Sequence, residues 1–125
     1  MKKIGYIKAS LKEEVEEQSE SLIAAECSKI YVEPVNNFNF QNKVKLVQII
    51  EILKSKDTLA VTRLSILSSS VQTLLELMFT LEEKEIILEA TKQQYISSNS
   101  YNLDELLFFL SEFIEDIRVE KQAAY

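Results

Sequence analysis

Ser10 is the side chain in this sequence best placed to act as a nucleophile. It follows a short apolar run, Lys3 to Ala9, and Lys8 stands two residues before it. A serine hydroxyl is a weak nucleophile until a neighbouring group activates it, and the sequence contains no histidine and places no arginine beside Ser10. Ser10 also has a structural interpretation, as a turn residue at the strand end or as the N-cap of the next helix. The residues alone favour the structural interpretation.

A second group of hydroxyl side chains lies in a Ser-rich stretch, Ser65 to Ser70. One of these serines is expected to cap the helix that follows. The others define a weaker hypothesis, in which the crevice at the carboxyl ends of the strands, near Ser10 and Ser65–Ser69, binds a small anion. Lys8 and Lys43 are candidates to assist by binding an anion weakly, but two solvated lysines are the favoured interpretation.

The sequence contains few side chains that could bind a metal ion or take part in redox chemistry. Cys27 is the single cysteine and histidine is absent, which excludes an internal disulfide and a cysteine-based metal cluster. Glutamates at positions 13, 14, 16, 17 and 20 point around a helix and predict a solvated face, not a cation site. We therefore expect no metal and no cofactor. With no signal-type segment and no apolar run of about 18–20 residues, we expect a soluble, cytoplasmic protein.

The charge balance argues against nucleic acid as a partner. The 125 residues include 14 basic and 20 acidic side chains, a formal charge of −6, which repels a phosphate backbone at long range. From Asp104 onward, the sequence has six acidic residues and only two basic ones, Arg118 and Lys121. We expect DNA binding by this chain to be weak or absent.

The chain alternates between short apolar runs and helical periodicity. Its length predicts one domain over residues 1–125, with an α/β core over 1–99 and a long helical segment over 100–125. Strands are predicted at 3–9, 29–33, 57–61, 85–89 and, as a short fifth, 94–96, and helices at 11–26, 43–55 and from 71 onward. Residues 36–42 predict a loop. This order indicates a mostly parallel sheet of four or five strands flanked by helices in three layers.

The last helix is predicted from about Leu103 to about Gln122, capped by Ser100 or Asn102, and is roughly 30 Å long. Its apolar residues cover a face too wide for one partner surface, so we expect part of it to meet a second subunit. A terminal helix folded wholly onto its own core is the alternative. The residues predicted for a homodimer interface are Leu106, Leu110, Phe113 and Ile117.

Four segments resemble the catalytic domain of the serine recombinases, the resolvase and invertase family. Ile4 to Ser10, which contains GYIKAS, is similar to the first-strand signature GYxRxS, and Asp57 to Ser70 resembles the block DxLxVxxLDRLxRS. Glu76-Leu77 with its helix fits the next segment, and Leu110 to Phe113 resembles the LAEFE start of the long dimerisation helix. Together they cover nearly the whole chain in the family's order. The resemblance implies a resolvase-like fold in which Ser10 holds the position of the serine that attacks DNA phosphate.

The active-site positions of that family are largely replaced. Where the family has an aspartate and two arginines, this sequence has Ser65, Ile66 and Ser69. Lys8 replaces the first-strand arginine, and Lys43 aligns best with the arginine that opens the helix after the mobile loop. Phosphoryl transfer relies on planar, permanently charged, bidentate donors, and lysine supplies only a point charge.

We therefore expect a non-catalytic resolvase-like protein that acts through dimerisation or protein association, with itself or with an active recombinase. The family implies a setting in DNA recombination or mobile elements. The alternative is the catalytic domain of an active serine recombinase, cut from a longer chain, that cleaves and rejoins DNA through Ser10. No helix-turn-helix domain of the kind that often follows in the family is expected in residues 1–125.

Overall fold

The α/β order predicted from the sequence is present in the computed structural model, which describes residues 1–35 and 43–123. The predicted loop at 36–42 and the last two residues of the predicted terminal segment lie outside these ranges. The elements are β1 (Lys3–Lys8), α1 (Lys12–Ala24), β2 (Lys29–Glu33), α2 (Val44–Ile52), β3 (Thr58–Val61), the 3₁₀ turn η1 (Leu64–Ile66), α3 (Val71–Glu83), β4 (Ile87–Ala90), η2 (Thr91–Gln93), β5 (Tyr95–Ile96) and α4 (Leu103–Ala123).

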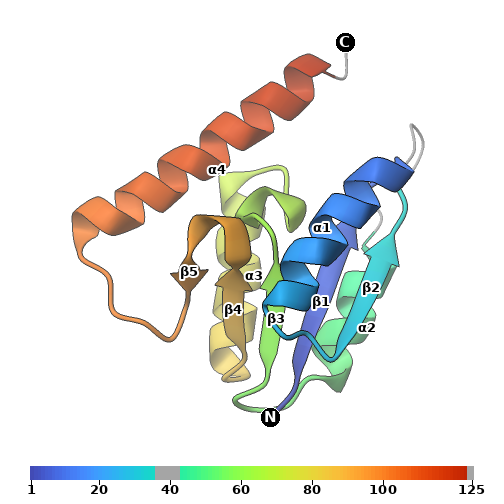
Figure 1. Cartoon of the computed structure of the whole chain (residues 1–125). Coiled ribbons are helices and arrows are strands. Elements are labelled where there is room, and N and C mark those ends of the chain that lie inside the picture. Colours follow the sequence, from blue (N-terminus) through green and yellow to red (C-terminus); the bar gives the residue numbers. More distant parts are fainter. Residues whose placement is uncertain (36–42, 124–125) are drawn as a thin grey trace.

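The sheet has the order β2-β1-β3-β4-β5. The first four strands are parallel, and β5 pairs antiparallel with β4. Helix α1 covers one face of the sheet, α2 and α3 cover the other, and α4 crosses the end of the sheet as a long rod (Figure 1). The five-stranded, mostly parallel sheet between helices confirms the predicted fold class.

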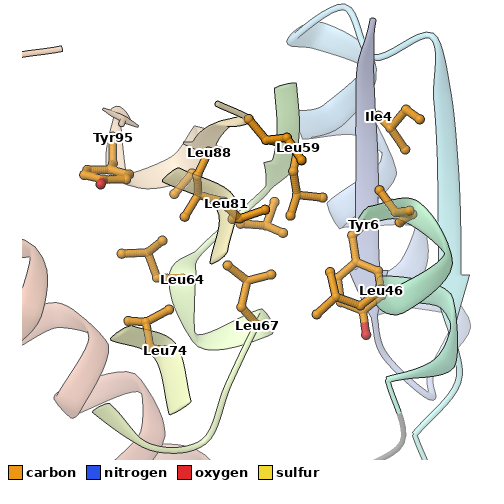
Figure 2. Close-up of a cluster of buried hydrophobic side chains, with 14 of the residues drawn as sticks. Ile4, Tyr6, Leu46, Leu59, Leu64, Leu67, Leu74, Leu81, Leu88 and Tyr95 are labelled. Atoms are coloured by element: carbon orange, nitrogen blue, oxygen red, sulfur yellow. The ribbon is translucent and has the colours of Figure 1, made fainter. Parts of the chain in front are cut away.

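Alternating side chains of the strands divide the core between the two faces, as the period of a strand requires. On β1, Ile7 packs with Leu22 of α1, whereas Tyr6 points to the opposite face. Tyr6 belongs to the larger of two apolar clusters, which also contains Leu46 from α2, Leu81 from α3 and neighbouring apolar side chains (Figure 2). Both faces of the sheet are therefore buried, which is why its strands are apolar runs.

Helices α3 and α4 begin at capping side chains, whereas no side-chain hydrogen bond caps α1 or α2. The Oγ of Ser70 accepts a hydrogen bond from the backbone N–H of Thr73 at 3.2 Å, and Oδ1 of Asn102 accepts one from the N–H of Glu105 at 2.8 Å, which confirms both predicted caps. Helix α3 ends where Glu85 takes a positive φ of 59°. Because that residue reverses the chain, β4 begins at Ile87 and not at Glu85 as predicted.

Helix α4 is apolar on two sides, and the four residues predicted for an interface divide between them. Phe113 and Ile117 are only 0% and 9% exposed and pack in the core of this chain. Leu106 is 46% exposed and Leu110 is half-buried, so both remain at the surface. Within the described ranges, neither α4 nor any other helix has the length and apolarity to cross a bilayer.

Gly5 marks the closest approach of β1 and α1. A Cβ atom at this position would lie 2.9 Å from Cδ1 of Leu22, 3.2 Å from Cγ1 of Ile30 and 3.3 Å from Sγ of Cys27. Leu22 is fully buried and has no room to withdraw. We expect Gly5→Ala to lower the free energy of unfolding by about 1–3 kcal/mol through overpacking, measured by urea denaturation. An unchanged urea midpoint would contradict this close packing.

Candidate functional site

Most of the candidate residues gather at the carboxyl edge of the sheet. Because β1, β2 and β3 are parallel neighbours, the segments that follow them leave the sheet at one edge. Ser10 follows β1, Lys43 begins α2 beside the end of β2, and Ser65 lies in η1 after β3. Ser69 lies farther along, immediately before the cap of α3, and is exposed.

Ser10 is exposed in the bend between β1 and α1. The N-cap residue of α1 is Leu11, and no side chain caps this helix end through a hydrogen bond. The interpretation of Ser10 as a helix N-cap is therefore wrong, and the turn at the strand end is the structural role that fits. The bend leaves the Ser10 side chain in contact with solvent at the edge where a ligand of this fold class binds.

Lys8 and Lys43 both lie near a carboxylate that the sequence analysis did not single out. Lys8 is paired in register with Glu33, the last residue of β2. Lys43 is half-buried at the N-cap position of α2, where burial lowers its pKa and the neighbouring charge of Glu33 partly opposes that shift. A cation that faces a carboxylate and is partly desolvated is a weaker partner for phosphate than a solvated one.

Glu33 is 3% exposed and is held from two sides. Its Oε1 accepts a hydrogen bond of 2.6 Å from the hydroxyl of Tyr6, and its Oε2 accepts one of 3.0 Å from the backbone N–H of Lys45 in the first turn of α2. A carboxylate at a helix N-terminus is stabilised by the free N–H groups and the helix dipole. Glu33 thus ties β1, β2 and α2 together. The signal in the sequence was a charged residue at the end of the predicted strand 29–33.

In the segment after β3, the one cation is bound by helix α4. Ser65 is half-buried, and Ile66 packs against the core. Nε of Arg63 donates to Oδ2 of Asp116 at 2.6 Å, and its Nη2 donates to Oε2 of Glu112 at 3.4 Å. The guanidinium group is therefore engaged by two carboxylates and is not directed at Ser10.

The sequence contains two arginines, and both are paired on α4. Arg118 donates a hydrogen bond to Oε2 of Glu115 on the same helix, and Arg63 binds the two carboxylates described above. Guanidinium groups are the side chains that hold phosphate in a bidentate manner. Neither of the two is free to do so at the carboxyl edge.

A cavity of about 310 Å³ opens beside η1, between α1 and α4. Its cations are matched by carboxylates, because Lys92 contacts Glu17 at 2.6 Å and Arg63 contacts Asp116. The lining residues are Glu14, Glu17, Gln18, Thr62, Arg63, Ser65, Ile66, Lys92, Asp116 and Val119. Ser65 lines this cavity and Ser10 does not, so the two serines proposed for one anion crevice do not share it.

Asp57, which begins the second family-like segment, has a structural role at the opposite edge of the sheet. Its carboxylate accepts backbone hydrogen bonds from Lys2 at 2.8 Å and from Lys54 at 2.9 Å. These two bonds lower the pKa of Asp57. Asp57 therefore holds the turn before β3 in place through backbone hydrogen bonds.

Comparison with known proteins identifies one family. Residues 3–124 match the family model described as Resolvase, N terminal domain. A search of curated proteins finds no match. The matched range includes β1 with Ser10, the segment after β3 and all of α4.

The Tyr6–Glu33 contact predicts a pH dependence of stability. Burial, together with the hydrogen bond and the charge of Glu33, raises the pKa of Tyr6 far above its usual range. Above about pH 10 the unfolded chain releases this phenolic proton and the folded chain retains it, so stability that is complete below pH 10 is lost as the pH rises.

We expect Tyr6→Phe to cost about 1–3 kcal/mol near neutral pH, because a buried carboxylate loses a donor. The difference from the native chain should then shrink above about pH 10, by up to ~1.4 kcal/mol per pH unit. Urea denaturation between neutral and alkaline pH measures both effects. Tyr31→Phe on β2, where the ring is half-buried, is the control. Equal losses in the two variants at every pH would argue against the contact.

Proposed function

Because the chain belongs to the family of resolvase N-terminal domains, the catalytic domains of serine recombinases, we propose that it is a resolvase-like protein of DNA recombination that acts through association, without cutting DNA. The fold and α4 are retained, whereas the groups that handle phosphate are replaced. Its partner is a second copy of this chain or an active recombinase of the same family. A setting in mobile genetic elements follows from the family alone.

The engagement of Arg63 by α4 carries this proposal. In the segment that supplies an aspartate and two arginines in the family, this chain has Ser65, Ile66 and Ser69. Arg63, the one arginine of this segment, is bound by Asp116 and Glu112. The loss of one preorganised donor to a phosphoryl transition state costs on the order of a hundredfold in rate. The loss of several supports a chain that leaves DNA uncut.

The surface charge supports weak or absent DNA binding. The formal charge is −6, and the exposed face of α1 carries a run of glutamates that includes Glu13, Glu16 and Glu20. Asp104, Glu105 and other acidic residues line α4, the helix that would approach phosphates. Affinity for DNA depends mainly on phosphate contacts, so an acidic surface of this kind disfavours it.

The outer side of α4 supports association through this helix. A stripe of apolar residues at spacings of four, three and four residues runs along it, and most of it is exposed although its inner neighbours Phe113 and Ile117 are buried. The outer stripe consists of Leu103, Leu107, Leu110 and Ile114, with Leu106 at its margin. An exposed apolar stripe on a long helix is the usual sign of a protein partner.

A search for a covalent protein–DNA adduct tests the catalytic part of the proposal. We expect the native chain to form no adduct with supercoiled plasmid DNA that carries its native flanking sequence, when the reaction is stopped by denaturation and analysed by gel electrophoresis. The alternative function, an active serine recombinase domain, predicts an adduct. An adduct that is lost in Ser10→Ala would overturn the proposal.

Sedimentation of the native chain and of two variants tests the association. We expect a dimer for the native chain and at least a tenfold weaker dissociation constant for Leu107→Asp, because a charge in an apolar interface must be desolvated without a partner. Phe79→Asp, on the exposed side of α3, is the matched control and should leave the constant unchanged. Loss of association in the α3 variant alone would place the interface elsewhere.

A further inference from the structure

The segment after β3 and helix α4 share one continuous polar network. Arg63 binds Oε2 of Glu112 and Oδ2 of Asp116 through its guanidinium group. The other oxygen of Glu112, Oε1, accepts a hydrogen bond of 3.2 Å from Nε2 of Gln93. Oε1 of Gln93 in turn accepts one of 2.8 Å from the backbone N–H of Leu64. Both oxygens of Glu112 are thereby linked to two consecutive residues of the same loop.

This network is partly shielded from solvent. Gln93 is 7% exposed, and the side chains of Arg63, Glu112 and Asp116 are 32%, 26% and 25% exposed. A planar guanidinium group held by two carboxylates fixes direction as well as distance. The position of α4 and the conformation of residues 62–66 are therefore set by the same contacts.

The inner side of α4 packs against the core, whereas the side that faces α1 lies beside a cavity. Phe113 and Ile117 enter the core, whereas Asp116 and Val119 line the cavity of about 310 Å³ that separates this part of α4 from α1. Arg63 lies on the wall of the same cavity. Where apolar contact is missing, the ion pair with Arg63 holds the helix at its angle to the sheet.

We propose that Arg63 is a positioning residue that couples the binding of a second copy of this chain on the outer stripe of α4 to the conformation of residues 62–66. The proposal rests on the proposed association through α4. A partner that contacts Leu107 and Ile114 favours one position of the helix, and the network transmits that preference to the backbone N–H of Leu64. Linkage requires the reverse as well, so a change in the loop alters the affinity for the partner.

Arg63→Gln is the direct test, and Arg118→Gln is its matched control, because Arg118 pairs with Glu115 within α4 and does not reach the loop. Two quantities are measured in each variant: the dissociation constant of self-association, by sedimentation, and hydrogen exchange of the Leu64 amide as protein concentration rises. A role in overall stability alone would speed exchange generally and leave the concentration dependence intact.

In the native chain, protection of the Leu64 amide is expected to rise with the fraction of dimer. Arg63→Gln should weaken self-association about fivefold or more and make this protection independent of concentration. Arg118→Gln should behave as the native chain. Asp116→Asn removes the same contact from the side of α4 and replaces Arg63→Gln in the test if that variant does not fold. Where both variants fold, the double variant should self-associate only a little more weakly than either single variant.

The outcomes separate this proposal from the function on which it rests. A native chain that stays monomeric overturns the association and the coupling together. A native dimer whose dissociation constant and Leu64 protection are unchanged in Arg63→Gln and in Asp116→Asn overturns the coupling alone. Equal effects of Arg63→Gln and Arg118→Gln also overturn it, because the loss of any positive charge paired with α4 would then be sufficient.

Discussion

The guanidinium group of Arg63, held between Asp116 and Glu112, joins the segment after β3 to helix α4, and the proposed function depends on this contact. Together with the burial of Phe113 and Ile117 in the core, it positions a helix of 21 residues across the end of the sheet, although one side of that helix faces a cavity. The same contact takes the one arginine near the carboxyl edge away from that edge. The cation that binds α4 is therefore engaged by carboxylates and is not available to phosphate.

Glu33 performs a similar task at the other side of the carboxyl edge. A buried carboxylate costs free energy unless donors satisfy it, and here the Tyr6 hydroxyl and the Lys45 N–H do so. The contact joins β1, β2 and the start of α2. It also leaves Lys43, partly desolvated, beside a negative charge. The edge retains the shape of the family fold, while its charges are organised for internal contacts.

Local patterns were sufficient to predict the strands, the helices and a cap within Ser65–Ser70 and at Ser100 or Asn102, because apolar periodicity and side-chain capping act over a few residues. The structure selects Ser70 and Asn102. The errors arose where distant residues decide the outcome. Both sides of α4 are apolar, so spacing did not reveal that Phe113 and Ile117 turn inward. The contact of Glu33 with Tyr6 spans 27 positions. The contacts of Arg63 span 49 and 53.

The central claim is that the carboxyl edge near Ser10 no longer engages DNA phosphate. The most direct measurement is a titration of isotope-labelled protein with a short duplex DNA at moderate ionic strength, with the backbone amides of Ser10, Lys43 and Ser65 as probes. The account predicts no saturable chemical-shift change at these amides. Saturable changes confined to them would contradict it, because they would show that the edge still binds the substrate of the family.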